Sequence, residues 1–355
     1  MKKLLFAAYD LGIGGIETAL ATLLDEIADK YEVTLVLEHA QGEFLSRIPK
    51  KVKIIEFTPS DKKNVFVRKT INFFKQLFFR LRYEHRFDFA ACYATFSLPS
   101  SFVARTASKN SVLWVHNDYL NFYNNDIAKY KKFFRDLKIN EFKKIVFVSS
   151  LDKKIFTAQF PQYIKKCVTC NNLIDYKSII KKSKESVDDF EKENIITFIN
   201  VGRHDEHQKR ISRLINATEK LHNEGYKFRV VLVGKGTNTS QYVRMAQKAK
   251  NIIFLGPKQN PYPYMKNSDC LVLSSQFEGY PVVFVEAQIL GIPIVTTDVS
   301  DAKEDIKDNY GIVTENSEEG VYRGMKEFLD YGFTPKEFDP KKYNQDILME
   351  LEKLI

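Results

Sequence analysis

Residues 268–298 read SDCLVLSSQFEGYPVVFVEAQILGIPIVTTD and hold the pattern that decides the fold. Two short apolar runs, 269–275 and 292–298, have the length and composition of buried strands. Between them, Pro281 precedes the apolar run VVFVEAQIL, as expected at the first turn of a mostly buried helix. A strand, a helix and a second strand in this order predict two parallel strands that are covered by helices.

Glu286 is the unexpected residue of this stretch, because it interrupts an otherwise apolar helix. An unpaired carboxylate in an apolar interior is costly, so such a group is usually paired, neutralised or in contact with a ligand. Glu278 lies eight residues earlier, in the loop before the helix. The two carboxylates therefore mark this loop and helix as a candidate site.

Strand-like and helix-like segments alternate through the rest of the chain as well. Helical spacing of apolar residues is clear at 16–30 and 208–225. Further strand-like runs lie at 3–9, 31–37, 87–93, 111–116, 144–150, 195–202, 228–234 and 251–256. Repeated alternation with fully apolar strands is typical of α/β proteins whose parallel sheets are covered on both faces.

The length of 355 residues suits two domains of this kind. We expect an α/β protein with two Rossmann-like, doubly wound domains, at 1–175 and 176–338, facing a central cleft. Ligands bind at the carboxyl ends of the strands in such sheets. The hydrophilic stretch 181–194 is expected to be an exposed linker or helix. Residues 339–355, with a helical pattern at 343–355, are expected to pack back on the first domain.

The composition argues against several other classes of protein. No apolar run reaches the length of about 18 residues that a membrane span requires. Asp10 interrupts the N-terminal apolar run, so a strand is favoured over a signal peptide. Four cysteines give no disulfide framework, and Cys167 and Cys170 form a lone CxxC, which does not favour zinc. These features favour a cytosolic protein without a metal site.

A glycine-rich loop follows the first strand, with Gly12, Gly14 and Gly15 ahead of a helix. Glycines let main-chain amides approach a phosphate or a sugar, and a helix N-terminus adds positive potential. The spacing is not GxGxxG, so the dinucleotide-binding fingerprint is absent. A plain tight turn explains the loop equally well.

A second loop, after the strand at 195–202, holds Arg203 and Lys209. An arginine at the end of a strand and a lysine six residues later could hold a diphosphate from two sides. Taken alone, the pair is more simply explained as two solvated cations in a loop.

Several motifs together resemble one enzyme family. They are GRHDEHQKRISRLINA (202–217), VLVGKG (231–236), IIFLG (252–256), the stretch 268–298 and GIGGIETALATLL (12–24). They resemble the retaining glycosyltransferases of family 4, which have the GT-B fold, in particular the bacterial members that assemble cell-surface polysaccharides. The resemblance covers nearly the whole chain. Its signature is a pair of glutamates eight residues apart, matched by Glu278 and Glu286.

The resemblance implies a role for each residue of a donor site. Glu286 would accept hydrogen bonds from the ribose hydroxyls of a nucleotide sugar, and Glu278 would contact hydroxyls of the donor sugar. Arg203 and Lys209 would stabilise the diphosphate leaving group in catalysis, so that neither a metal nor another cofactor would be required. The other donor-binding positions that it implies are Gly14, Gly15, Gly279, Tyr280, Pro281 and Val282.

The histidines and two further positions complete the comparison with the family. His116 matches a histidine of the N-terminal domain and would face the donor sugar as a catalytic residue; alone, a histidine at a strand end is more often a structural hydrogen-bonding group. Asn172 matches an asparagine at the crossing between domains, whereas His204 and His207 have no assigned role. Arg210 departs from the family, which commonly has glycine after the lysine.

Positive charge is concentrated in the first half of the chain. Residues 1–175 hold 28 Lys and Arg against 18 Asp and Glu, whereas 176–355 hold 26 against 27. The segment 62–86 alone has eight Lys and Arg and one Glu, with apolar residues at helical spacing. Such a helix suits an anionic bilayer surface; a core-packed helix with a solvated charged face is the alternative. The stretch 129–138 would extend this surface, and no motif indicates nucleic acid as a partner.

These observations lead to one expected function and two alternatives. We expect a cytoplasmic hexosyltransferase, peripheral on the inner face of the cell membrane. It would transfer a sugar, with retention, from a nucleotide-diphosphate sugar, expected to be UDP-linked, to a lipid-linked glycan. Association with other polysaccharide-assembly enzymes fits this function. The alternatives are a GT-B nucleotide-sugar epimerase and a non-catalytic, membrane-associated binding subunit of a glycosyltransferase complex.

Overall fold

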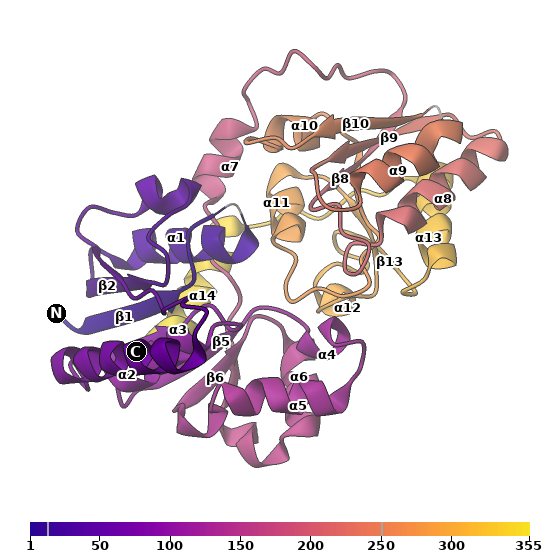
Figure 1. The fold of residues 1–355 in the computed structure, drawn as a ribbon. Helices are drawn as coiled ribbons and strands as arrows, with labels where there is room; N and C mark the ends of the chain where they lie inside the picture. Colours follow the sequence, from indigo (N-terminus) through magenta and orange to yellow (C-terminus); the bar gives the residue numbers. More distant parts are fainter. Residues whose placement is uncertain (13, 250) are drawn as a thin grey trace. The chain divides into compact units, whose positions relative to one another are not determined.

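The computed structural model describes residues 1–12, 14–249 and 251–355 (Figure 1). The chain divides into two compact units. Unit 1 comprises Met1–Leu173 and Asn344–Ile355, and unit 2 comprises Ile174–Tyr343. Each unit is built on a parallel sheet with helices, so the predicted α/β class is confirmed for both.

Unit 1 has seven parallel strands among its described residues, in the order β3-β2-β1-β4-β5-β6-β7. The strands are β1 (Lys3–Ala8), β2 (Glu32–Leu37), β3 (Lys53–Glu56), β4 (Phe89–Cys92), β5 (Ser111–Val115), β6 (Lys144–Phe147) and β7 (Cys167–Thr169). The helices are α1 (Gly15–Ile27), α2 (Val65–Tyr83), α3 (Leu98–Ala107), α4 (Tyr119–Phe122), α5 (Ile127–Asp136), α6 (Ser150–Gln159) and the C-terminal α14 (Pro340–Leu354).

Unit 2 has six parallel strands in its described part, in the order β10-β9-β8-β11-β12-β13. The strands are β8 (Ile196–Val201), β9 (Phe228–Val233), β10 (Ile252–Gly256), β11 (Cys270–Leu273), β12 (Ile294–Thr297) and β13 (Gly311–Thr314). The helices are α7 (Tyr176–Lys182), α8 (Ile211–Asn223), α9 (Thr239–Met245), α10 (Tyr262–Lys266), α11 (Val282–Leu290), α12 (Ala302–Asp305) and α13 (Glu318–Tyr331). Short 3₁₀ helices lie in unit 1 at Glu43–Arg47, Ile139–Glu141 and Pro161–Lys166, and in unit 2 at Ala246–Lys248.

Both strand orders reverse beside the first strand of the unit. In unit 1, β2 and β3 lie on one side of β1 and β4 to β7 on the other; in unit 2, β9 and β10 lie on one side of β8 and β11 to β13 on the other. Ligands of doubly wound sheets bind at such a reversal, outside the carboxyl ends of the strands. The loops after β1 and β4, and those after β8 and β11, therefore lie where sites are expected.

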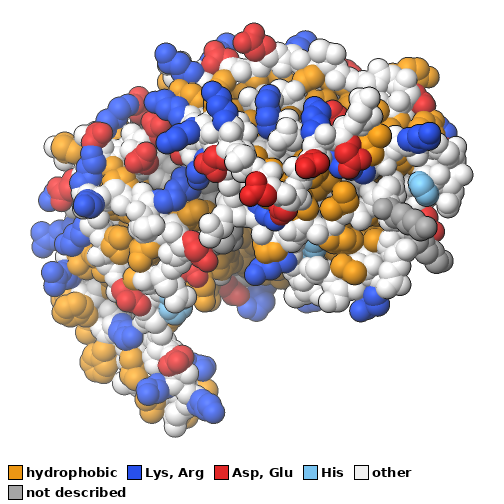
Figure 2. Space-filling view, turned by 90° about the horizontal axis from the view of Figure 1, so that it is seen from above, with side chains coloured by type: hydrophobic (Ala, Val, Ile, Leu, Met, Phe, Trp, Pro, Cys, Tyr) orange, Lys and Arg blue, Asp and Glu red, His pale blue; other side chains and the backbone are white. Residues whose placement is uncertain are grey.

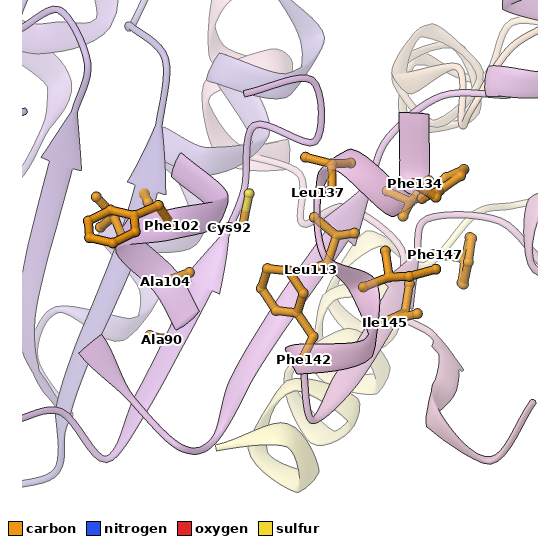
Figure 3. Close-up of a cluster of buried hydrophobic side chains, with 14 of the residues drawn as sticks. Ala90, Cys92, Phe102, Ala104, Leu113, Phe134, Leu137, Phe142, Ile145 and Phe147 are labelled. Carbon is orange, nitrogen blue, oxygen red and sulfur yellow. The ribbon is translucent and has the colours of Figure 1, made fainter. Parts of the chain in front are cut away.

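Each sheet is covered by apolar side chains. In unit 1, Figure 3 shows Leu113 of β5 beside Phe142 and near Leu137, and all three side chains are buried. In unit 2, the successive β8 residues Phe198 and Ile199 belong to different buried clusters. Because successive strand residues point to opposite faces, the sheet of unit 2 is packed on both faces, as its continuous apolar strands predicted.

The C-terminal helix expected at 343–355 is present as α14, which begins three residues earlier, at Pro340. Ile347, Leu351 and Leu354 are buried, and the Asn110 side chain donates a hydrogen bond to the Leu354 carbonyl at 3.0 Å. These contacts attach the last two turns of α14, coloured yellow in Figure 1, to unit 1.

The stretch 181–194 is largely exposed, as expected, but it lies within unit 2 and does not link the two units. Only its first two residues are helical, as the end of α7, and the rest is irregular chain that belongs to unit 2. Phe190 is buried, with the guanidinium of Arg229 over its ring, and Asp189 accepts a hydrogen bond from Tyr264 at 2.6 Å. One aromatic residue in a charged stretch is a weak sequence signal, yet here it anchors the segment.

The four cysteines are buried and form no disulfide bridge. Burial raises the pKa of Cys167 to about 11 and that of Cys170 to about 12, so both remain thiols near neutral pH. Within the described ranges, no group of three or more His, Cys, Asp or Glu side chains could hold a metal ion. No described helix is long and apolar enough to cross a membrane.

Candidate functional site

The loop after β8 places Arg203 and Lys209. Asp205 shapes this loop: its Oδ1 atom accepts a hydrogen bond from the Gln208 amide at 3.0 Å, and its carbonyl accepts one from the Lys209 amide at 2.9 Å. The turn brings the Lys209 side chain back over Gly202, where a Cβ would lie 3.6 Å from Lys209 Cε. Lys209 is thereby directed toward the end of β8, and Arg203 remains exposed.

Arg210 precedes α8 in a left-handed conformation, with φ of 48° and ψ of 44°. Glycine adopts this conformation freely and other residues do so at a cost. Glu206 supports the turn, because it accepts hydrogen bonds from Ser212 Oγ at 2.6 Å and from the Tyr242 hydroxyl at 2.8 Å. The departure at Arg210 therefore preserves the turn that glycine would favour, and Lys209 keeps its place.

Glu278, in the loop after β11, is the centre of a hydrogen-bonded network and is only 6% exposed. Its Oε1 atom accepts hydrogen bonds from Lys209 Nζ and Ser275 Oγ, both at 2.7 Å. Its Oε2 atom accepts one from Gln208 Nε2 at 3.2 Å, and Gln208 Oε1 accepts one from Arg203 at 3.1 Å. Three residues singled out in the sequence thus belong to one network, and the buried charge of Glu278 is compensated.

The two loops of this network are also joined through their main chains. The Gln276 amide donates to the Gln208 carbonyl at 2.7 Å, and Ser274 Oγ donates to the Lys209 carbonyl at 3.0 Å. Arg213, on α8, donates to the Gln276 side chain at 2.6 Å. Because β8 and β11 are neighbours at the reversal of the strand order, these bonds fix both loops at the carboxyl edge of the sheet.

Glu286 lies in the second turn of α11, which begins after Pro281 as the sequence predicted. The Tyr262 hydroxyl donates a hydrogen bond to Glu286 Oε1 at 3.1 Å. Burial raises the pKa of Glu286 to about 7, and the bond from Tyr262 opposes part of this rise. Near neutral pH this carboxyl is therefore partly protonated and partly ionised. Strongly shifted pKa values are typical of residues in functional sites.

The segment Gly279–Val282 leads into the N-terminus of α11. Gly279 is buried, and its carbonyl accepts a hydrogen bond from Ser300 Oγ at 2.5 Å. The amides of the first helical turn have no partner within a helix, and the helix dipole makes this end positive. An anion such as a phosphate would be stabilised there, beside the loop that holds Glu278.

The glycine-rich loop of unit 1 is less suited to a phosphate than its sequence suggests. Gly14 caps α1, and the carboxylate of Glu17 folds over it, where a Cβ on Gly14 would collide with Glu17 Oε2. Gly15 is the first residue of the helix, and Ile13 lies outside the described residues. A carboxylate at a helix N-terminus offsets its positive potential. This loop therefore suits a neutral group, such as a sugar hydroxyl, better than a phosphate.

His116 follows β5 in unit 1 and is 7% exposed. Its ring lies against Tyr93, with ring centroids 4.4 Å apart. Neither ring nitrogen has a hydrogen-bond partner among the residues that the structure describes. Burial lowers the pKa of His116 to about 3, so the imidazole is neutral near pH 7. A purely structural hydrogen-bonding role is thus not supported, whereas a ligand hydroxyl would satisfy the ring.

The remaining residues singled out in the sequence lie outside the network. His204 is buried, and its Nδ1 atom lies 3.0 Å from Thr239 Oγ1. His207 packs its ring against Phe277, with centroids 5.3 Å apart. Asn172 is buried two residues before unit 2 begins. Each of the two histidines thus contacts a neighbouring side chain of unit 2.

The basic segment at 62–86 forms α2, whose apolar face is largely exposed. Phe74 and Phe78 are 60% and 62% exposed, whereas Phe79 alone on this helix is buried. Lys75 donates a hydrogen bond to the Thr58 carbonyl at 2.8 Å, which helps to attach the helix to unit 1. Figure 2 shows hydrophobic side chains beside Lys and Arg at its lower left, where α2 lies. The core-packed alternative is therefore wrong for most of this helix.

The second cationic stretch, 129–138, behaves differently. It falls largely in α5, where Tyr130 and Phe134 are buried in the core of unit 1 and the lysines face solvent. Its buried aromatic residues therefore do not extend the exposed apolar surface of α2, and this part of the expectation was wrong. Its exposed basic residues leave the cationic part of the expectation as a prediction.

Sequence reasoning missed three residues that complete the site. Gln208 and Ser275 bind Glu278, and Tyr262 binds Glu286. Gln208 lies one residue before Lys209, so its position in the same loop could have indicated it as a site residue. Ser275 and Tyr262 gave no signal, because their contacts depend on strand adjacency and on the docking of α10 against α11.

Comparisons with known proteins agree with this arrangement. The family model described as "Glycosyl transferases group 1" matches residues 180–345, which is nearly all of unit 2. Over 353 residues the chain is 25% identical to a Campylobacter jejuni protein named N-acetylgalactosamine-N,N'-diacetylbacillosaminyl-diphospho-undecaprenol 4-alpha-N-acetylgalactosaminyltransferase, covering 93% of this chain and 91% of that protein.

Two further comparisons extend over most of the chain. A second protein of the same bacterium, named GalNAc-alpha-(1->4)-GalNAc-alpha-(1->3)-diNAcBac-PP-undecaprenol alpha-1,4-N-acetyl-D-galactosaminyltransferase, is 24% identical over 318 residues, covering 87% of this chain and 83% of that protein. The crystal structure of Anabaena HepE in complex with UDP and glucose has a TM-score of 0.74 at 17% identity, covering 99% of this chain and 100% of that one. At this identity the likeness shows the fold alone, and the predicted GT-B fold is confirmed.

Proposed function

We propose that the protein is a retaining, metal-independent hexosyltransferase of family 4, because residues 180–345 match the family model described as "Glycosyl transferases group 1". Its donor is a nucleotide-diphosphate sugar, expected to be UDP-linked. Its acceptor is a hydroxyl of a lipid-linked glycan in the assembly of a cell-surface polysaccharide.

The observation that carries the proposal is the network of Arg203, Gln208, Lys209 and Glu278 at the reversal of the strand order in unit 2. It holds two cations beside a buried carboxylate, and the positive end of α11 follows in the same loop. This combination suits a sugar attached to a diphosphate: the cations and the helix end match the phosphates, and Glu278 can accept hydrogen bonds from sugar hydroxyls.

The donor would alter the network when it binds. A diphosphate oxygen competes with Glu278 for Lys209, and release of Lys209 frees one carboxylate oxygen for the donor sugar. Glu286 in its ionised form can accept hydrogen bonds from ribose hydroxyls. The exchange keeps each charge compensated, so that neither Lys209 nor Glu278 is left buried without a partner.

In the transfer itself, the bond between the sugar C1 and the diphosphate oxygen breaks and a bond from C1 to the acceptor oxygen forms. The acceptor approaches on the face of the leaving group, which retains the configuration, and its proton passes to the departing phosphate. Charge grows on the diphosphate in the transition state, so fixed cations at Arg203 and Lys209 lower the barrier. His116, neutral and without a partner among the described residues, is available to bind a sugar hydroxyl.

The exposed face of α2 supports a lipid-linked acceptor. A helix that presents phenylalanines beside lysines and arginines binds an anionic bilayer through apolar burial and charge together. Both Campylobacter relatives are named for undecaprenol-linked substrates. We therefore place the protein on the inner face of the cell membrane, attached peripherally through 62–86, where other polysaccharide-assembly enzymes could associate with it.

Saturation-transfer NMR with UDP-, GDP- and ADP-sugars tests the donor site. We expect selective binding of one nucleotide, lost in Glu286→Ala and retained in Glu319→Ala, which removes an exposed carboxylate of the same unit. Binding of no nucleotide sugar, or binding that ignores Glu286, would contradict the proposal. Transfer assays then separate the alternatives: an epimerase isomerises the sugar without an acceptor, and a binding subunit tolerates Glu278→Gln.

A further inference from the structure

Three aromatic rings form a row on unit 1 that the donor site does not use. The ring centroid of Tyr9 lies 5.1 Å from that of His39 and 5.7 Å from that of Phe96. Tyr9 and Phe96 are 39% and 47% exposed, and His39 is partly exposed. Core packing does not account for rings that remain this open to solvent.

The row lies at the carboxyl ends of three neighbouring strands. Tyr9 follows β1, His39 follows β2 and Phe96 lies after β4, and the sheet order β2-β1-β4 places these strands side by side. The His39 amide donates to the Tyr9 carbonyl at 2.9 Å, which continues the pairing of β2 with β1 up to the rings. The rings therefore cross the reversal of the strand order in unit 1, where a ligand is expected.

A buried carboxylate fixes the loops beneath the row. Glu38, 6% exposed, accepts hydrogen bonds from Ser97 Oγ and, at 3.3 Å, from Ser100 Oγ. Ser97 also caps α3, because its Oγ atom accepts the Ser100 amide at 2.9 Å. Glu38 thus ties the loop after β2 to the loop after β4, on either side of Tyr9. A surface held in this way loses little conformational freedom when it binds a ligand.

From this geometry we propose that Tyr9, His39 and Phe96 form a platform on which a pyranose ring of the acceptor glycan stacks. One face of a pyranose presents C–H bonds with slight positive charge, which match the negative faces of aromatic rings. The Tyr9 hydroxyl and the His39 imidazole can exchange hydrogen bonds with the sugar hydroxyls around the ring edge.

The neighbouring loop supports a neutral ligand of this kind. Glu17 offsets the positive end of α1 at Gly14, so the edge of unit 1 next to Tyr9 is not suited to a phosphate. The inference rests on the proposed transferase function, because it names the chemical class that the acceptor site would recognise: a sugar rather than a phosphate or a peptide.

Saturation-transfer NMR of the full chain with methyl α-pyranosides of N-acetylgalactosamine, N-acetylglucosamine, galactose and glucose tests the platform directly. We expect at least one of these probes to receive saturation from the protein. The signal should be lost in Tyr9→Ala and in Phe96→Ala, and retained in Tyr9→Phe, which keeps the ring. Tyr331→Ala is the matched control, because it removes an aromatic side chain that is 85% exposed in unit 2.

Once an acceptor is available, the KM for it should rise about three- to tenfold in Phe96→Ala, while the KM for the donor stays unchanged. Absence of pyranoside binding to the wild-type protein, or equal binding to Tyr9→Ala and Phe96→Ala, would overturn the platform. Failure of the transferase proposal is a separate result, because it is detected by nucleotide-sugar binding and its dependence on Glu286.

Discussion

At the scale of single residues, Glu286 combines a cost in stability with a proposed role in binding. Its pKa of about 7 lies well above the ordinary value of 4.5, so between these values the folded protein holds a proton that the unfolded chain has released. The free energy of unfolding therefore falls as pH rises through this range. The full loss of stability is reached above the pKa that Glu286 has in the folded protein.

We expect Glu286→Gln to remove this cost. The variant should be more stable than the wild type by on the order of 1–3 kcal/mol at about pH 8, and the difference should shrink toward about pH 5. Urea unfolding at the two pH values measures both effects. Glu319→Gln, at an exposed position, should show no such trend; a constant difference between Glu286→Gln and wild type across this range would contradict the assignment.

Arg210 provides a second prediction at this scale, because its left-handed conformation favours glycine. Arg210→Gly and Arg210→Ala both remove the ion pair with Glu206, but alanine keeps the backbone strain and glycine relieves it. Glycine should therefore be the more stable of the two by about 1 kcal/mol.

Lys220, inside α8, supplies the matched comparison for thermal or urea unfolding. At that helical position the order should reverse, with alanine more stable than glycine by about 1 kcal/mol. The same order at both positions would mean that Arg210 does not adopt the left-handed conformation in solution.

At the scale of elements, α2 and α5 show why composition does not decide where a helix packs. Both are cationic and aromatic, yet Phe74 and Phe78 of α2 face solvent while Tyr130 and Phe134 of α5 enter the core. Helical periodicity reports that an apolar face exists, but the surface that covers this face depends on the whole unit. Only the structure separates an exposed amphipathic helix from a core helix here.

We expect the double substitution Phe74→Ser and Phe78→Ser to abolish co-sedimentation with vesicles that contain phosphatidylglycerol. The fold should be unaffected, since both side chains are more than half exposed. Met349→Ser, at an exposed apolar position of α14, should leave vesicle binding intact. Binding by the wild type should weaken with added salt, because anionic lipid contributes about 1 kcal/mol per basic residue near the surface.

The strands that were predicted include every central strand and one edge strand, β10. The missed strands are β3, β7 and β13, and each lies at an edge of its sheet. These three edge strands are short and each pairs with a single neighbour, so they lack the longer apolar run that marked the predicted strands. β3 illustrates this, because three of its four residues are exposed. The central strands, by contrast, were predicted because burial on both faces requires apolar side chains throughout.

At the scale of the whole molecule, the sequence singled out candidate site residues but did not indicate how they meet. Arg203, Lys209 and Glu278 were singled out through the resemblance to the glycosyltransferase family. Their joining depends on β8 and β11 being neighbours although β9 and β10 lie between them in the chain. The aromatic row of unit 1 was not predicted for the same reason, since Tyr9, His39 and Phe96 are separated by long stretches of sequence.

The division of the chain into two units leads to the last prediction. Every residue proposed to hold the nucleotide, apart from the glycines at 14 and 15, lies in unit 2, which has buried clusters on both faces of its own sheet. A unit with its own core can fold alone. A fragment of residues 174–343 should therefore fold cooperatively and bind the same nucleotide as the full chain, and Glu286→Ala in the fragment should abolish this binding.

Because His116 and the aromatic row lie in unit 1, the fragment should transfer no sugar. Circular dichroism, nucleotide titration and a transfer assay measure the three properties, and a folded fragment that fails to bind nucleotide would show that unit 1 supplies an essential part of the donor site.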